Sequence, residues 1–138
     1  MKENFTYYIA YGSNLNKTQM KQRCPGAKCV GSTYLKDYKL RFNLHLTIQK
    51  CEGEKIPVGI WQISKEDEVA LDIYEEYPSY YRKEYLDIEI NGTIKKCLVY
   101  IMIDIKDRVD MPPTEEYLQR CIQGYKDFNF DLKYLKIQ

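Results

Sequence analysis

The chain has 138 residues and a formal net charge of +1; 44% of its residues are hydrophobic and 30% are charged. This balance is ordinary for a globular protein and argues against intrinsic disorder. No long run of one charge sign is present, so nothing indicates binding to the phosphates of nucleic acids. The length predicts one domain, spanning residues 1–138, with a core of its own.

The five cysteines indicate a reducing compartment, because they are odd in number and scattered along the chain. Cys24 and Cys29 could form a metal or redox pair, but their spacing is wide and no second pair follows, so two incidental thiols are favoured. The N-terminal residues lack the apolar stretch of a secretory signal, and no apolar run approaches the length of a membrane span. We therefore expect a soluble cytoplasmic protein without a metal site.

The first half of the chain alternates between strand-like and turn-like segments. In chain order, the pattern predicts a strand that ends at Tyr11, a helix over 17–23, one long or bent strand over 31–48, a turn at 50–55 and a strand over 56–63. Asn14 or Asn16 is the candidate N-cap of the helix. Gly59, inside the last of these strands, indicates a bulge or a close approach of two backbones.

The second half of the chain predicts two helices on either side of a hairpin. The expected elements are a helix from Ser64 to Tyr77-Pro78, strands over 81–90 and 93–105, and a helix over 115–128. Asp67, three residues after Ser64, comes close to a capping box. Asn91-Gly92 is the strongest hairpin signal in the chain. The order βαββαββα, with hairpins, predicts an α+β fold with a mixed or antiparallel, curled sheet.

The first predicted strand ends in the turn-prone sequence Gly12-Ser13-Asn14. Glycine permits a close approach, and serine and asparagine tolerate turn geometry. Successive N–H groups that lead into a helix can also form a concavity for an anion. The glycine spacing and the lysine of a nucleotide phosphate loop are missing. An ordinary strand-to-helix turn and an anion-binding loop both remain open at this point.

Two adjacent carboxylates, Glu75 and Glu76, lie at the end of the predicted second helix, among the tyrosines at 74, 77, 80 and 81. A carboxylate that is partly desolvated among aromatic rings has a raised pKa, which suits proton transfer near neutral pH. On a helical wheel both glutamates border the apolar face, so periodicity does not choose between them. Two solvated glutamates at a helix end are the alternative.

Together these stretches resemble the γ-glutamylcyclotransferase-like superfamily. Tyr11-Gly12-Ser13-Asn14-Leu15 looks like its YGSNL signature, Val58 to Trp61 is similar to its glycine-and-tryptophan strand, Leu71 to Glu75 resembles its LDxYE element, Tyr81-Arg82 follows at the usual place, and Tyr117 to Tyr125 suits its final helix. The resemblance covers nearly the whole chain, in order, and is nearest to the small γ-glutamylamine cyclotransferase and AIG-like branch. It implies a small mixed β-barrel flanked by helices.

The resemblance assigns Glu75 as the catalytic acid/base, Tyr11 to Leu15 as the glutamyl-binding loop and Tyr81 as a tyrosine that lines the pocket. The implied reaction closes the γ-glutamyl group of a small amine or amino acid conjugate to 5-oxoproline and releases the amine. It needs no metal, cofactor or covalent nucleophile, which agrees with reading the single histidine, His45, as a strand residue. Glu76 departs from the family pattern, because relatives commonly carry glycine there.

The extra charge and bulk of Glu76 could alter the size of the pocket or its preference for a leaving group. The competing interpretation is a non-catalytic module on the same fold that binds a γ-glutamyl group or a small anion. In both cases the expected partner is a small γ-glutamyl compound, with no nucleic acid and no membrane. The protein itself is expected to be a monomer or a homodimer.

Overall fold

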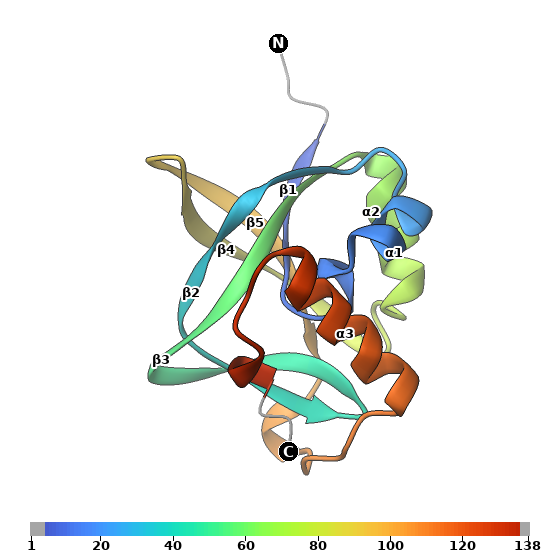
Figure 1. The fold of residues 1–138 in the computed structure, drawn as a ribbon, viewed down its shortest axis with the longest axis vertical. Helices are drawn as coiled ribbons and strands as arrows, with labels where there is room; N and C mark the ends of the chain where they lie inside the picture. Colours follow the sequence, from blue (N-terminus) through green and yellow to red (C-terminus); the bar gives the residue numbers. More distant parts are fainter. Residues whose placement is uncertain (1–4, 136–138) are drawn as a thin grey trace.

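The computed structural model describes residues 5–135. Its elements are, in chain order, β1 (Thr6–Ala10), the 3-10 helix η1 (Ser13–Leu15), α1 (Lys17–Arg23), β2 (Lys28–Asn43), β3 (His45–Ile63), α2 (Lys65–Tyr74), β4 (Tyr81–Ile90), β5 (Thr93–Met102), η2 (Ile105–Asp107), α3 (Glu115–Asp127) and η3 (Leu132–Leu135) (Figure 1). The predicted order βαββαββα is confirmed. No helix among the described residues combines the length and the hydropathy needed to cross a membrane.

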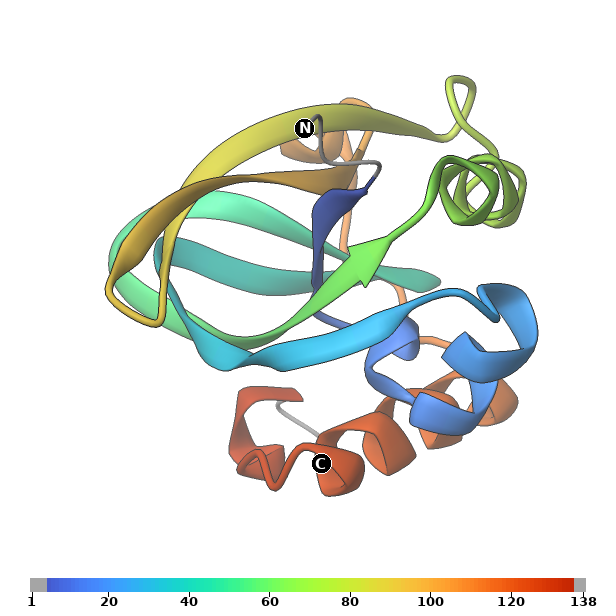
Figure 2. The same ribbon diagram turned by 90° about the horizontal axis from the view of Figure 1, so that it is seen from above.

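The strands form one mixed sheet with the order β2-β3-β1-β5-β4. β1 pairs antiparallel with β3 and parallel with β5, while the β2–β3 and β4–β5 pairs are antiparallel hairpins. The sheet curls strongly on itself, as the view from above shows (Figure 2). The predicted α+β fold with a mixed, curled sheet is therefore confirmed. β1 lies in the middle of the sheet, and its residues Tyr8, Ile9 and Ala10 are buried.

The β2–β3 hairpin corrects two predictions, the single strand over 31–48 and the turn at 50–55. The chain reverses at Leu44, which has a φ of 67°, and the sheet continues through residues 50–55, where a turn was expected. The register shifts here, so that Cys51 to Glu54 bulge opposite Asp37, whose Oδ1 accepts a hydrogen bond from Gly53 N at 3.0 Å. The polar, glycine-containing segment therefore forms a bulge inside one long strand. The composition of residues 50–55 alone did not distinguish a turn between two strands from a bulge inside one strand.

Two predicted boundaries also differ from the structure. β5 ends at Met102 and not at residue 105, where η2 begins. α2 ends at Tyr74, three positions before Tyr77-Pro78, because Glu75 forms its C-cap and Glu76 adopts a left-handed conformation with a φ of 53°. The next residues form turns that lead into β4. The helix therefore ends at the glutamates, and their side chains leave its last turn.

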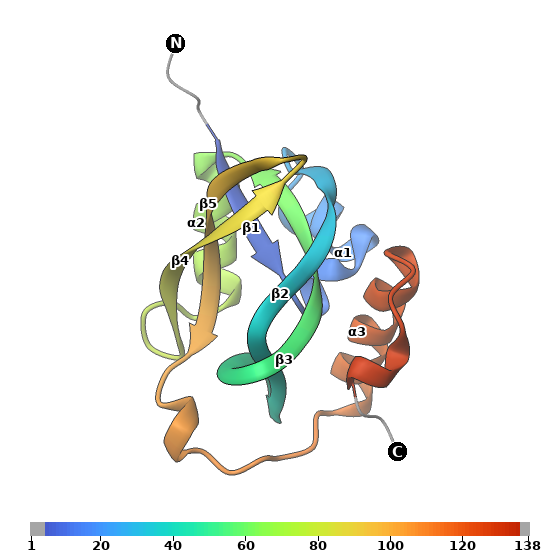
Figure 3. The ribbon, with the colours of Figure 1, turned by 90° about the vertical axis from the view of Figure 1, so that its left-hand side faces the viewer.

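The helix starts and the contact at Gly59 follow the sequence signals. Asn16 caps α1 by accepting from Gln19 N at 3.0 Å, and Ser64 and Asp67 form a complete capping box on α2. A Cβ atom at Gly59 would lie 2.7 Å from the ring of Phe128, so this glycine allows close approach. In Figure 3, α1 and α3 lie to the right of β1 and α2 lies to its left, and Figure 1 shows α1 next to α2.

Candidate active site

The loop between β1 and α1 lies at the end of the central strand. The backbone N–H groups of Gly12, Ser13 and Asn14 donate to no protein atom within residues 5–135, whereas that of Leu15 donates to the carbonyl of Gly12 at 3.0 Å. A Cβ atom at Gly12 would lie 3.1 Å from the side chain of Leu46, so glycine lets the loop approach β3 closely. Three successive free N–H groups can hold an anionic oxygen.

The loop is supported from two sides. The indole Nε1 of Trp61 on β3 donates to the carbonyl of Asn14 at 3.1 Å. On the other side, α3 contacts the loop backbone directly: a Cβ atom at Gly124 would lie 2.6 Å from Asn16 N and 2.7 Å from the carbonyl carbon of Leu15. The direction of the N–H groups therefore depends on contacts with distant parts of the chain.

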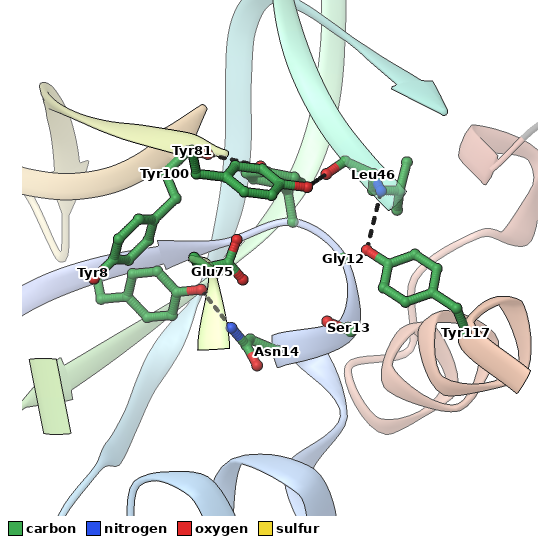
Figure 4. A pocket seen from close by; sticks show the side chains of 10 residues that line it. Tyr8, Gly12, Ser13, Asn14, Leu46, Glu75, Tyr81, Tyr100 and Tyr117 are labelled. Atoms are coloured by element: carbon green, nitrogen blue, oxygen red, sulfur yellow. Dashed lines mark hydrogen bonds between the residues drawn. The ribbon is translucent and has the colours of Figure 1, made fainter. Parts of the chain in front are cut away.

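Glu75 leaves the last turn of α2 and enters the centre of the site (Figure 4). Its backbone N–H donates to the carbonyl of Leu71 at 2.8 Å. Its carboxyl group has no hydrogen-bond partner in the described part of the chain. Although the residue as a whole is only half-buried, the protein around its carboxyl group desolvates it and raises its pKa from 4.5 to about 8, against a smaller lowering effect of Arg23. This marks a functional-site candidate.

The carboxyl group faces a small inner pocket with a volume of about 20 Å³. Its lining residues are Tyr8, Tyr11, Gly12, Ser13, Asn14, Leu46, Glu75, Tyr81, Tyr100 and Tyr117. The structure thus brings together all the site residues named from the sequence except Leu15, which is fully buried beneath the loop. The roles assigned to them stay predictions.

Two tyrosines bind the backbone of Leu46 at the edge of this inner pocket. The hydroxyl of Tyr81 donates to the Leu46 carbonyl at 2.7 Å, and the hydroxyl of Tyr117 accepts from Leu46 N at 3.0 Å (Figure 4). The hydroxyl of Tyr11 donates to the carbonyl of Tyr100 at 2.6 Å. These bonds satisfy hydroxyl groups that would be costly to bury alone, and they hold the aromatic walls in place.

An arginine and an asparagine link the loop to the walls. Arg23 Nη1 donates to Asn14 Oδ1, and Asn14 Nδ2 donates to the hydroxyl of Tyr8 at 2.8 Å. The guanidinium group of Arg23 also lies 3.5 Å from the centre of the Tyr74 ring. The hydroxyl of Tyr74 is 2.9 Å from Ser13 Oγ. The positive charge of Arg23 is thus fixed near the carboxyl group whose pKa it lowers.

A second, outer pocket of about 150 Å³ continues from the first. The two share Ser13, Glu75, Tyr81 and Tyr117; the outer one adds His45, Tyr74, Glu76, Tyr80 and Arg120. The inner volume is sufficient for about one water molecule. A ligand larger than that must therefore extend into the outer pocket or displace the walls.

Sequence reasoning missed several pocket residues. Tyr8, Leu46, Tyr100 and Tyr117 come from separate elements; the abundance of tyrosine was the signal for the three tyrosines, and none pointed to Leu46. Conversely, Tyr77 was expected to wall the carboxylate, but its side chain is 40% exposed and lines neither pocket. The early end of α2 turns it away from the site.

The fold and the site define an α+β domain with a carboxyl-containing pocket at the end of its central strand. The chain belongs to the family described as "Gamma-glutamyl cyclotransferase, AIG2-like", whose sequence model matches residues 8–119. A bovine γ-glutamylcyclotransferase is 27% identical over 151 aligned positions, which cover 97% of this chain and 77% of the bovine protein. These relationships support a cyclotransferase activity in general.

Solved structures show the same fold. One named "Gamma-glutamyl cyclotransferase" has a TM-score of 0.81 and 24% identity, and the match covers 96% of this chain and 85% of that one. A mouse AIG2-like protein has a TM-score of 0.59 and 15% identity, with coverage of 82% and 90%. The finer placement in the AIG-like branch stays a prediction.

Proposed function

We propose that this protein cyclises the γ-glutamyl group of a small γ-glutamyl amine or amino acid to 5-oxoproline and releases the amine. The observation that carries the proposal is the carboxyl group of Glu75. It has no protein partner in the described residues, its pKa is raised to about 8, and it lines the same pocket as Gly12, Ser13 and Asn14, whose backbone N–H groups donate to no atom of residues 5–135. Membership of the cyclotransferase family supports this reaction.

The first requirement is a substrate conformation in which the two reacting groups meet. Both groups belong to one molecule, since the free α-amine of the glutamyl group attacks its own γ-carbonyl carbon. Holding such a conformer supplies much of the catalysis. The N–H groups of Gly12, Ser13 and Asn14 are suited to bind the α-carboxylate or the oxygen of the γ-carbonyl, which becomes negative during attack. Tyr11 and Tyr81 wall the bound group.

The second requirement is the transfer of one proton. Ionised Glu75 accepts a proton as the α-amine forms the new C–N bond. It then gives a proton to the leaving nitrogen as the old C–N bond breaks. The products are 5-oxoproline and a free amine, and Glu75 returns to its starting state. A pKa of about 8 favours both transfers near neutral pH.

The leaving group extends from the inner pocket into the outer pocket, because the inner one has a volume of only about 20 Å³. Ser13, Glu75, Tyr81 and Tyr117 border both pockets, which supports a scissile bond near this shared boundary. Small γ-glutamyl amines and γ-glutamyl amino acids are the substrate class that fits this arrangement.

The test is 5-oxoproline release from a panel of γ-glutamyl amines and amino acids, measured with the natural chain and with Glu75→Gln. We expect the variant to lose at least about 10²-fold in kcat, because the amide cannot exchange the proton. Glu66→Gln, at an exposed acid of the same helix, is the matched control. Full activity in Glu75→Gln would refute the assigned role.

Measurements of substrate binding distinguish the enzyme from the competing interpretation, a non-catalytic binding module. Calorimetry with the same panel and Glu75→Gln measures affinity without turnover. Binding accompanied by no release from any panel member in the natural chain would favour a non-catalytic module that holds the γ-glutamyl group.

A further inference from the structure

Another pocket lies on the opposite face of β4 and β5 from the candidate active site. This rear pocket has a volume of about 460 Å³, within the range of about 300–1,000 Å³ that is typical of small-molecule sites. It is lined by Tyr38, Ile48, Gln49, Lys50, Arg82, Glu84, Ile101, Ile105 and Lys106. None of these residues lines the inner or the outer pocket of the active site.

The alternation of side chains along the strands separates the two sites. On β4, Tyr81 lines the active site, and the next residue, Arg82, lines the rear pocket. On β5, Tyr100 and Ile101 divide in the same way. Successive side chains of a strand point to opposite faces, and Arg82 is the register partner of Ile101. A ligand in the rear pocket therefore does not enter the active site.

Three buried isoleucines form the apolar part of the rear pocket: Ile48, Ile101 and Ile105. Ile105 begins η2, and Arg41 fixes this turn, because its Nη1 donates to the carbonyl of Ile105 at 2.7 Å. Its Nη2 also donates to the carbonyl of Arg108 at 2.6 Å. The apolar wall is thus held in place by the fold, and it can cover the hydrocarbon part of a ligand.

Tyr38 is a buried residue of the rear pocket whose hydroxyl group has no protein partner. The residue is only 6% exposed, yet its hydroxyl makes no hydrogen bond to any of residues 5–135. Among the side-chain atoms of these residues that lack a partner, only the hydroxyl of Tyr125 is fully enclosed. The hydroxyl of Tyr38 is therefore accessible from the pocket, where it can donate to an oxygen atom of a ligand.

The position of this hydroxyl group is set by the strands around it. Tyr38 directly follows the bulge at Asp37, and bulges commonly redirect a side chain. Burial and the charge of Glu84 raise the pKa of Tyr38, whereas Arg82 lowers it. The hydroxyl group thus lies near both charged residues and stays protonated at neutral pH.

The lining of the rear pocket carries more positive than negative charge. It includes three cations, Lys50, Arg82 and Lys106, and one carboxylate, Glu84. Arg82 Nη1 lies 2.5 Å from Glu84 Oε2, but both side chains are partly exposed, so this ion pair is weak. No ion pair involves either lysine in the part of the chain that the structure describes. The excess of positive charge favours an anion.

We propose that the rear pocket is a second ligand site, which binds a small carboxylate with an apolar body. The carboxylate accepts hydrogen bonds from Tyr38 and Arg82, and the two lysines attract it. The isoleucines cover the apolar body, which an inorganic anion lacks. The site does not depend on the proposed cyclisation, because the two share no residue.

The test uses phenylbutyrate as the probe and three compounds that each lack one of its features. Phenylbutanol has the same body without the charge, phenylbutylamine has the opposite charge, and butyrate has the charge with little apolar surface. Titrations are followed by NMR of isotopically labelled isoleucine and leucine methyl groups. We expect phenylbutyrate to bind about fivefold or more tightly than each of the others.

The methyl signals also locate the bound probe. Phenylbutyrate should shift the signals of Ile48, Ile101 and Ile105, but not that of Leu46, which lines the active site. Equal affinities for the four compounds, no shift of the isoleucine signals, or shifts confined to Leu46 would each overturn the proposal.

Two variants test the polar contacts. Tyr38→Phe removes a hydroxyl group without a protein partner, so the melting temperature should stay the same while the affinity for phenylbutyrate falls about fivefold. Arg82→Gln should lower the affinity by a similar factor. Tyr34→Phe on β2 and Lys96→Gln on β5, at exposed positions outside the rear pocket, are the controls. Unchanged affinity in both Tyr38→Phe and Arg82→Gln would show that these residues do not form the site.

Glu75→Gln distinguishes the rear pocket from the active site. This variant changes the charge of the active site alone, so it should bind phenylbutyrate as tightly as the natural chain does. The measurement does not use the reaction, so its result is independent of whether the chain releases 5-oxoproline. A large change of affinity in Glu75→Gln would show that the probe binds in the active site, which would overturn the proposal.

Discussion

At the scale of single residues, the raised pKa of Glu75 makes the stability of the protein depend on pH. The folded chain holds the proton up to a pH of about 8, whereas an unfolded glutamate releases it near 4.5. Between these values the folded state binds more protons, so the free energy of unfolding falls as the pH rises. Burying this carboxyl group therefore costs the protein stability under the alkaline conditions in which it is ionised.

We expect Glu75→Gln to become more stable than the natural chain as the pH rises from 5 to 8.5. The relative gain should be on the order of a few kcal/mol, at about 1.4 kcal/mol per pKa unit. Urea unfolding at both pH values measures it. If the free energy of unfolding changes with pH by the same amount in both proteins, the pKa of Glu75 is not strongly raised.

Arg23 provides a second test of the same carboxyl group. Its positive charge lowers the pKa of Glu75, so Arg23→Gln should raise that pKa. The rise of kcat/KM with pH, which reports ionisation of the free enzyme, should then move to higher pH. Lys21→Gln, at an exposed position of the same helix, is the control and should not move it. A downward displacement in Arg23→Gln would disprove the electrostatic link.

Glu76 occupies a backbone position that favours glycine. Its φ of 53° places it in the left-handed region, where a side chain costs energy and glycine does not. We expect Glu76→Gly to raise the free energy of unfolding by about 1 kcal/mol. The control is Glu66→Gly inside α2, which should lower it by a similar amount. A destabilised Glu76→Gly variant would show that its side chain contributes to the fold.

At the scale of elements, the contact between α3 and the loop controls the geometry of the site. A Cβ atom at Gly124 would lie within 2.8 Å of loop backbone and of Leu15 Cβ, so Gly124→Ala must push the helix and the loop apart. We expect a loss of about 1–3 kcal/mol in the free energy of unfolding and a lower kcat, because the N–H groups change direction.

Gln123→Ala, at the exposed neighbouring position on α3, is the control for this prediction and should change stability by no more than about 0.5 kcal/mol. Thermal unfolding and 5-oxoproline release, measured on the same samples, check both effects. If Gly124→Ala retains full activity despite lower stability, the loop does not depend on this helix for its geometry.

At the scale of the whole molecule, local signals predicted the elements and part of the site. Capping residues such as Ser64 and Asp67 and the alternation of strands depend on neighbours along the chain, so their consequences could be read from the sequence. Glu75 and the loop at Gly12 to Asn14 were identified because they follow such elements and because their motifs resemble a known family.

The remaining features depend on contacts between distant segments. Strand pairing and the packing of α3 against the loop determine that Tyr8, Tyr100 and Tyr117 line the pocket. No local sequence pattern encodes either of these contacts. Residues 50–55 were predicted as a turn because a polar bulge and a turn have similar compositions, and the reversal at Leu44 was missed because leucine is not a typical turn residue. Register and helix docking therefore set the limit of what could be predicted.

The central position of β1 also determines when the site can form during synthesis. Tyr7 and Tyr8 pair with Cys97 and Leu98, so the first strand to leave the ribosome cannot complete its pairing until the last strand, β5, has emerged. The loop between β1 and α1 also needs its contact with Gly124 on α3, which emerges later still. A nascent chain thus cannot complete the pocket until almost all of it has emerged, and fragments that lack α3 are expected to lack the pocket.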